Sequence, residues 1–230
     1  MHLLVTNDYP PKIGGIQTYL WELWRRMPQD SFQVFTSPYA NASLWDTQQG
    51  HHIERYDRFW MPPSRRVSSR TIAHADRVDA SLVVIDPAVP LGAIGPDLGR
   101  PYAVILHGAE VSVPGRLPGS KELLRRAVAN ADLVISASRF AEAEAARVVD
   151  SMPPVVYVPP GVDTDRFVPL TADERRSARR RLGFDPDAPL VVGVSRLVPR
   201  KGFDTLIEAA ARLADTHPGL QVVIAGTGRD

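Results

Sequence analysis

The sequence predicts an α/β fold organised around a mostly parallel β-sheet. Short apolar runs rich in β-branched residues alternate, along 230 residues, with segments whose apolar positions recur at helical spacing. Parallel neighbouring strands need a crossover connection, and a helix usually provides it. Polar or glycine-rich residues follow several of the runs, at the strand ends where sheets of this kind bind ligands. These observations together predict Rossmann-like units.

The first part of the chain, residues 1–165, is expected to form one such domain. A strand at 2–6 leads into a rigid turn at 7–11, and Gly14 and Gly15 open a helix. The apolar positions of that helix follow a helical period and are Ile16, Tyr19, Leu20, Leu23 and Met27. Further strands are expected at 32–36, 82–85, 102–106, 133–136 and 155–158, with a turn at 86–92 and helices at about 120–131 and 139–149.

Residues 166–189 are expected to connect this domain to a second, incomplete one at 190–230. Thr171 and Glu174 form a capping-box signature, and Gly183 is a natural end for the arginine-rich helix between them, which is expected to be solvated. A strand–helix–strand unit follows at 190–194, 203–214 and 220–225. A unit of this size cannot cover both faces of its own sheet, so exposed apolar surface is expected.

Composition narrows the class of protein. The hydrophobic share of 44% is ordinary for a globular chain, and the net charge of +1 gives no reason to expect nucleic acid as a partner. Cysteine is absent, which excludes disulfides and thiolate metal sites and suits a reducing cytoplasm. No secretory signal is recognisable, and no run approaches the roughly 20 apolar residues that span a bilayer. A cytoplasmic location is therefore expected.

Two features are typical of phosphate binding. Arg196 and Lys201 follow an apolar strand and lie five positions apart, as a clamp for a polyanion such as a diphosphate would. Gly14 and Gly15 would expose backbone N–H groups at a helix start, where the helix dipole favours negative charge. Solvated surface cations and a simple turn are the alternatives. No G-x-G-x-x-G sequence follows the first strand, so the dinucleotide fingerprint is absent.

Four segments in order carry a resemblance to a known family. They are 6–11 (Thr-Asn-Asp-Tyr-Pro-Pro) with 14–17 (Gly-Gly-Ile-Gln), 107–110 (His-Gly-Ala-Glu), 159–167 (Pro-Pro-Gly-Val-Asp-Thr-Asp-Arg-Phe) and 195–202 (Ser-Arg-Leu-Val-Pro-Arg-Lys-Gly). The chain resembles the retaining glycosyltransferases of family 4, which have the two-domain GT-B fold. It is most similar to actinobacterial GDP-mannose-dependent phosphatidylinositol mannoside mannosyltransferases.

The resemblance implies roles for particular residues. Arg196 and Lys201 would contact the donor diphosphate together with the helix start at Gly14 and Gly15, and no metal or other cofactor is expected. His107 would lie near the donor sugar, although a satisfied histidine at a strand end is the alternative. Independently of the resemblance, Asp8 lies at the carboxyl end of the first strand, facing the same cleft, where it would position the acceptor hydroxyl or else simply form the turn. Retention of anomeric configuration is likewise implied by the family.

The resemblance also marks what the sequence lacks. The second domain of the family carries a Glu-x7-Glu motif whose carboxylates contact the donor sugar and the ribose, and these 230 residues do not contain it. The chain by itself is therefore expected to turn over substrate poorly.

Residues 55–77 are the candidate acceptor segment. Six arginines there are interleaved with three large apolar residues, Phe59, Trp60 and Met61; the arginines are Arg55, Arg58, Arg65, Arg66, Arg70 and Arg77. Basic side chains beside exposed aromatics suit an anionic membrane, and Arg65, Arg66, Arg70 and Trp60 are the predicted contacts. The alternative is a flexible surface loop with its aromatics buried. His51 and His52 have no partners at metal-ligand spacing and are expected to be solvated.

These features predict a hexosyltransferase that moves mannose from GDP-mannose to a phosphatidylinositol mannoside-type glycolipid. The enzyme would be peripheral at the inner face of the plasma membrane. Two alternatives stay open. One is a GT-B transferase with another sugar nucleotide, such as a UDP-sugar, and a soluble acceptor; the other is a non-catalytic, truncated binding remnant.

Overall fold

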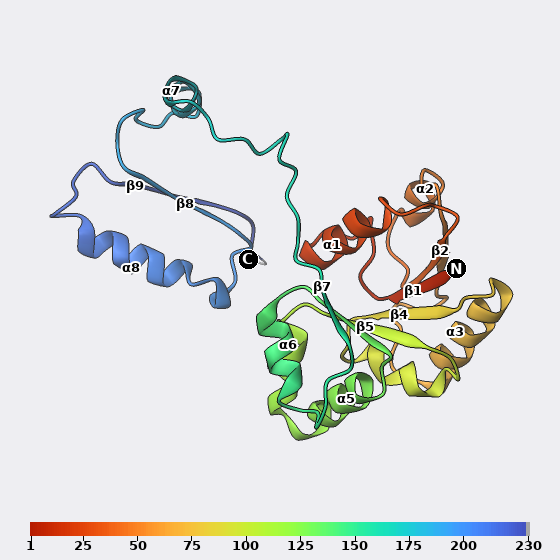
Figure 1. Ribbon diagram of the computed structural model, residues 1–230. Helices are drawn as coiled ribbons and strands as arrows, with labels where there is room; N and C mark the ends of the chain where they lie inside the picture. Colours follow the sequence, from red (N-terminus) through yellow and green to blue (C-terminus); the bar gives the residue numbers. More distant parts are fainter. Residues whose placement is uncertain (229–230) are drawn as a thin grey trace. The chain divides into compact units, whose positions relative to one another are not determined.

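The computed structural model describes residues 1–228 and divides the chain into two compact units, Met1–Gly161 and Val162–Asp230 (Figure 1). The sequence places the end of the first domain at 165, whereas the structure divides the chain after Gly161. Residues 229–230 of the predicted segment 190–230 lie outside the described residues.

The first unit is built on seven parallel strands in the order β3-β2-β1-β4-β5-β6-β7. In chain order they are β1 (His2–Thr6), β2 (Phe32–Thr36), β3 (His52–Arg55), β4 (Leu82–Asp86), β5 (Tyr102–Leu106), β6 (Leu133–Ser136) and β7 (Val155–Tyr157). The order reverses between β1 and β4. At such a point the connections leave in opposite directions and open a crevice beyond the carboxyl ends of the strands.

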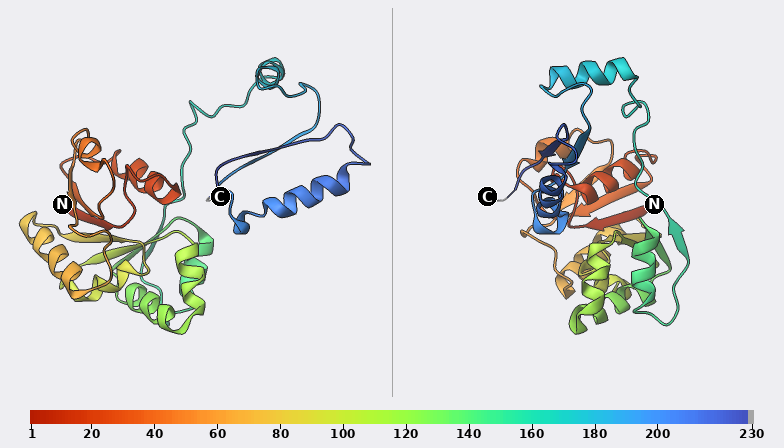
Figure 2. Two further views of the ribbon diagram at one scale, coloured as in Figure 1. Left: turned by 180° about the vertical axis from the view of Figure 1, so that it is seen from behind. Right: turned by 90° about the vertical axis from the view of Figure 1, so that its left-hand side faces the viewer.

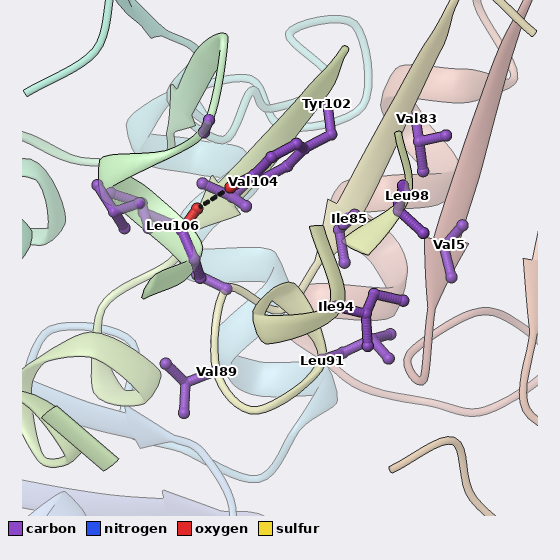
Figure 3. Packing of buried hydrophobic residues seen from close by; sticks show 14 of the residues in the cluster. Val5, Val83, Ile85, Val89, Leu91, Ile94, Leu98, Tyr102, Val104 and Leu106 are labelled. Atoms are coloured by element: carbon purple, nitrogen blue, oxygen red, sulfur yellow. Dashed lines mark hydrogen bonds between the residues drawn. The ribbon is translucent and has the colours of Figure 1, made fainter. Parts of the chain in front are cut away.

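Helices cover both faces of this sheet (Figures 1 and 2). They are α1 (Gly15–Trp24), α2 (Ala42–Asp46), α3 (Arg65–Arg77), η1 (Leu91–Asp97), α4 (Ala109–Ser112), η2 (Pro114–Arg116), α5 (Pro118–Ala129) and α6 (Arg139–Ala146). Leu3 and Val5 pack with side chains of α3, η1, α5 and α6, whereas Leu4 packs with α1 on the opposite face. The period of two along the strand produces this division. Figure 3 shows the first cluster around Val5 and Ile85.

The predicted mostly parallel α/β architecture is confirmed. The strands expected at 2–6, 32–36, 102–106 and 133–136 form at those bounds, while β4 includes Asp86, which the sequence places in the following turn. Strand β3 and helices α2 and α3 were not expected. The sequence of β3, His-Ile-Glu-Arg, has one aliphatic residue because it is an edge strand, and its Glu54 instead forms ion pairs with Arg70 and Arg77 of α3.

The second unit contains a two-stranded parallel sheet with one crossover helix. Its elements are α7 (Ala172–Arg181), β8 (Leu190–Val194), η3 (Pro199–Lys201), α8 (Phe203–Leu213) and β9 (Gln221–Ala225). The capping box forms at the start of α7, where Thr171 and Glu174 bond reciprocally, and Gly183 follows the helix in a left-handed conformation (φ 78°). No described residue of this unit is buried, and Val194 is 77% exposed.

This difference in burial predicts different local stabilities in the two units. Amides of β8 and β9 should exchange with solvent at least about 1,000-fold faster than those of β1, β4 and β5, since opening a unit without a buried core requires little free energy. Hydrogen exchange followed by mass spectrometry on the 230-residue chain measures both sets together. Equal protection of β8 and β4 would contradict the prediction.

Candidate functional site

A polar cluster lies where the order of the strands reverses. Thr6 is the last residue of β1, Asp86 is the last residue of β4, and His107 directly follows β5. The parallel register places Thr6 opposite Asp86. Because the carboxyl ends of parallel strands meet at one edge of a sheet, these three side chains converge on the point that binds ligands in such folds.

The three side chains form a continuous hydrogen-bonded chain. The Thr6 hydroxyl donates to Asp86 Oδ2 (2.7 Å), and His107 Nε2 lies 2.5 Å from Asp86 Oδ1. The backbone N–H of Asp8 in turn donates to Thr6 Oγ1 (2.8 Å). Asp86 is fully buried and the His107 side chain is 11% exposed, so only the histidine is open to a ligand.

The charges around Asp86 and His107 favour the protonated form of His107. Burial raises the pKa of Asp86. The hydrogen bond and charge of His107 and the hydrogen bond of Thr6 lower it again, but only in part. Burial alone would lower the pKa of His107, but the hydrogen bond and charge of Asp86, with smaller contributions from Glu110 and Asp8, raise it above its ordinary value. The imidazolium form of His107 therefore persists to higher pH than in a solvated histidine.

Glu110 holds the backbone around His107, and Tyr19 packs against its ring. The Glu110 carboxylate accepts from the backbone N–H groups of His107 and of Gly108 (2.9 and 3.0 Å for Gly108), which would otherwise be unsatisfied at the start of α4. Gly108 has φ 147°, a conformation that other residues rarely adopt. The Tyr19 ring stacks edge-on against His107 (centroids 5.2 Å apart), and its hydroxyl donates to the Val158 carbonyl (2.7 Å).

Asp8 links the turn after β1 to helix α1. Its Oδ1 accepts from Lys12 Nζ (2.6 Å) and from Gln17 Nε2 (2.5 Å), while no described residue bonds Oδ2. Gly14 precedes α1, and a Cβ there would lie 2.2 Å from Gln17 Oε1, whereas the space at Gly15 is open. Asp8, Gly14, Gly15 and His107 thus belong to one unit of the chain.

The predicted acceptor segment is largely helical, so the alternative of a flexible loop is wrong for residues 65–77, which form α3. Most of its arginines form ion pairs: Arg55–Asp46 (2.6 Å), Arg66–Asp57 (2.6 Å), Arg70–Glu54 (3.1 Å) and Arg77–Glu54. Arg65 has no ion pair within residues 1–228. The two aromatic residues are exposed (Phe59 93%, Trp60 42%), so the alternative of buried aromatics is wrong as well, whereas the neighbouring Met61 is buried.

Arg55 of this segment and the nearby His51 have structural roles that the sequence did not reveal. Arg55 also donates to the Ser37 carbonyl (3.0 Å) and the Pro10 carbonyl (2.7 Å), and so joins the loops after β1 and β2. His51 is buried, with its ring nitrogens 3.0 Å from the Tyr9 hydroxyl and 2.8 Å from Gln29 Oε1. The expectation of a solvated His51 is wrong.

Arg196 and Lys201 belong to the second unit. Arg196 follows β8 and Lys201 ends η3; both are exposed, and neither has an ion pair among residues 1–228. Gly226 fixes this strand end, because a Cβ there would lie 1.8 Å from the Ser195 carbonyl oxygen. The chain immediately before Arg196 is therefore held against the end of β9.

Residues 1–228 contain neither a membrane-spanning helix nor a metal-binding cluster. None of the described helices is long and apolar enough to span a bilayer. The same residues contain no group of three or more histidine or acidic side chains placed to hold a metal ion.

Comparison with known proteins matches both parts of the chain to families. Residues 13–166 match the family described as Glycosyltransferase Family 4, and residues 174–230 match Glycosyl transferases group 1. A GDP-mannose-dependent monoacylated alpha-(1-6)-phosphatidylinositol monomannoside mannosyltransferase of Corynebacterium glutamicum is 32% identical over 99% of this chain and 61% of its own length. A GDP-mannose-dependent alpha-(1-6)-phosphatidylinositol monomannoside mannosyltransferase of Mycolicibacterium smegmatis is 36% identical over 98% and 60%.

The chain is also similar to a third relative over a shorter stretch and to two solved structures. A D-inositol 3-phosphate glycosyltransferase of Geodermatophilus obscurus is 48% identical over 29% of this chain and 14% of its own. Anabaena Alr3699/HepE in complex with UDP superposes with a TM-score of 0.77 at 21% identity (99% of this chain, 61% of that one). Sucrose-phosphate synthase from Thermosynechococcus elongatus gives 0.69 at 18% (98% and 62%). These structures confirm the expected GT-B type of fold.

The cap formed by Glu110 predicts a measurable loss of stability. Glu110→Ala leaves the N–H groups of His107 and Gly108 without their acceptor and should lower the free energy of unfolding by about 1–2 kcal/mol. Glu122→Ala is the control, because its ion pair with Arg125 is exposed and worth little. Urea unfolding monitored by tryptophan fluorescence compares the two variants. An equal effect of both would show that Glu110 does not cap the loop.

Proposed function

The chain belongs to glycosyltransferase family 4, and we propose that it transfers mannose from GDP-mannose to a phosphatidylinositol mannoside-type glycolipid, with retention of anomeric configuration. The main support is the identity of 32% and 36% to two GDP-mannose-dependent mannosyltransferases over nearly the whole chain. The chain spans about 61% of the length of the first of these relatives. Donor, acceptor and activity are accordingly proposals for the present chain.

The proposed chemistry separates charge at the donor. When the anomeric C–O bond breaks, positive charge develops on the sugar and the nucleoside diphosphate leaves as an anion. Preorganised cations and backbone N–H groups stabilise such a leaving group. Arg196 and Lys201 are exposed and have no ion pair among the described residues, so both are available for this role, and the helix start at Gly14 and Gly15 is a second source of N–H groups. No metal is required for this arrangement.

His107 and Asp8 serve the sugar and the acceptor in this proposal. His107 lies at the carboxyl end of β5, beside the point where the strand order reverses, which supports contact with the donor sugar. Asp8 uses Oδ1 to hold the turn, and its Oδ2 is left to accept a hydrogen bond from an acceptor hydroxyl. The two contacts at Oδ1 would keep the carboxylate in place.

We also propose that the protein binds the anionic surface of a membrane peripherally, where a lipid acceptor would be found. Exposed Phe59 and Trp60 lie between buried Tyr56 and Met61. The Asn7 side chain bonds both the backbone N–H and the carbonyl of Met61 (3.0 Å each), which fixes the base of this loop. Aromatic side chains presented in this way can enter the interface between lipid and water. Arg66 and Arg70 are ion-paired and so contribute less than the sequence suggests.

A second candidate has one observation in its favour. The match to a D-inositol 3-phosphate glycosyltransferase reaches 48% identity, though over only 29% of this chain. This relative supports a soluble inositol phosphate as the acceptor in place of a glycolipid. Offering both acceptors to the same enzyme, with GDP-mannose and a UDP-sugar as competing donors, separates the two candidates.

The donor proposal is tested in a chimera in which the remainder of the Corynebacterium glutamicum relative follows residue 230. Transfer of labelled mannose from GDP-mannose to a phosphatidylinositol monomannoside is expected. Arg196→Ala or Lys201→Ala should each lower kcat/KM by an amount that corresponds to about 2–4 kcal/mol of lost transition-state stabilisation, the scale for losing one preorganised donor. Arg200→Ala is the matched control, because Arg200 is an exposed cation in the same turn.

The outcomes of this assay separate the claims. Near-normal rates for both Arg196→Ala and Lys201→Ala would remove the diphosphate assignment. Transfer only from a UDP-sugar, or only to inositol phosphate, would replace the proposed substrates with those of the second candidate. Absence of any transfer by a folded chimera would favour a binding remnant.

Membrane binding is tested by sedimentation with vesicles of phosphatidylcholine and phosphatidylglycerol. Replacing both Phe59 and Trp60 by serine should weaken binding at least about tenfold, because burying one large apolar side chain contributes about 1.5–3 kcal/mol. Leu182→Ser removes a comparably exposed apolar residue of the second unit and is the control. If replacing Arg65, Arg66 and Arg70 abolishes binding but replacing Phe59 and Trp60 does not, the arginines form the membrane contact and the loop does not.

A further inference from the structure

The polar cluster contains a carboxylate that the proposed chemistry does not use. Asp86 is fully buried, and its partners are the Thr6 hydroxyl and His107 Nε2. A buried carboxylate is unfavourable unless hydrogen bonds compensate for the lost water, and here one partner comes from each neighbouring strand. Asp86 has no exposed surface through which to touch a substrate. Of its two hydrogen-bonded partners, Thr6 is fully buried and only His107 has exposed surface, so His107 is the partner through which Asp86 can act on a substrate.

We propose that Asp86 is the positioning residue for His107: it holds the imidazole by Nε2, so that Nδ1–H is presented to an oxygen of the sugar-nucleotide donor. Nε2 is committed to Asp86, and Nδ1 has no hydrogen-bond partner among residues 1–228. Thr6 fixes the second carboxylate oxygen, which prevents the carboxylate from rotating. The assignment of a substrate to Nδ1 rests on the proposed function, whereas the orientation and protonation of the ring do not.

The groups facing His107 from each neighbouring element favour its charged, doubly protonated form. Asp86 lies on β4, Glu110 on α4, and Asp8 in the turn after β1, and each raises the pKa of His107 against the opposing effect of burial. Tyr19 of α1 contributes a ring edge, and burial raises the pKa of its phenol to about 12, so it stays neutral. The Asp8 carboxylate is itself paired with Lys12. An imidazolium held in this way is a fixed donor for an oxygen that gains negative charge.

The orientation can be measured on the 230-residue chain by NMR. In the wild-type protein, the His107 ring should titrate above the ordinary histidine pKa, and nitrogen shifts should place the proton of the neutral form on Nε2. In Asp86→Asn the charge is lost while burial remains, so His107 should titrate below the ordinary value. A His107→Gln spectrum assigns the resonance among the six histidines.

Glu54→Gln is the matched control for this measurement. Glu54 also faces a histidine, His74 (3.2 Å from Nδ1), but it lies on β3, which is not adjacent to β5 in the sheet. The titration of His107 should be unchanged in this variant. An unchanged His107 titration in Asp86→Asn would overturn the proposal. So would an Nδ1–H neutral tautomer in the wild-type protein, a result that does not require Asp86→Asn to fold.

Activity of the chimera then separates this proposal from the proposed function. Asp86→Asn should lower kcat about 100-fold, the scale for losing a preorganised donor, with little change in KM for the acceptor. The alkaline limb of the pH–rate profile should move to lower pH, which a purely structural role would not produce. Wild-type kcat and profile in Asp86→Asn would overturn the positioning role. Failure of the wild-type chimera to transfer sugar would count against the proposed function, while the NMR results still decide the orientation.

Discussion

The carboxylate of Asp86 joins three strand ends, and the geometry of the candidate site depends on it. Thr6 of β1 and His107 after β5 both bond this one buried group at the end of β4. Because the strands are parallel and in register, their tips differ little in height, and two short side chains suffice to connect them. The turn after β1 is joined to the same chain through the N–H of Asp8. Movement of any one strand end would therefore be transmitted to His107.

The sequence predicted the architecture better than the contacts within the candidate site. Strands such as 102–106 are continuous apolar runs, since strands buried on both faces leave no room for polar residues. The sequence singles out His107 because it directly follows such a run. Asp86 was missed because it precedes Pro87 and stands in a segment that is typical of a turn. Only the pairing of β4 with β1 and β5, which no local pattern encodes, shows that it faces His107.

For the arginine-rich segment 55–77, the sequence overestimates the amount of unpaired positive charge. Six arginines in 55–77 suggest a strongly basic surface, but the acids that pair with four of them are Asp46, Glu54 and Asp57. Helix α3 brings Arg70 and Arg77 onto the same face, where both meet Glu54 of an edge strand. The placement of Arg70 and Arg77 thus reflects packing of the helix against the edge strand. Exposed Phe59 and Trp60 are what distinguishes the surface from an ordinary solvated face.

The two units differ in how deeply their functional charged side chains are buried. In the first unit, the buried charge of Asp86 depends on its partners, and this dependence fixes the orientation of His107. In the second unit no described residue is buried. The side chains of Arg196 and Lys201 are exposed and have no ion pair among residues 1–228. A cation in water attracts a phosphate weakly, because solvent screens it. Their contribution to binding a diphosphate therefore depends on how far a bound ligand and surrounding protein exclude water, whereas the orientation of His107 is already set within the first unit.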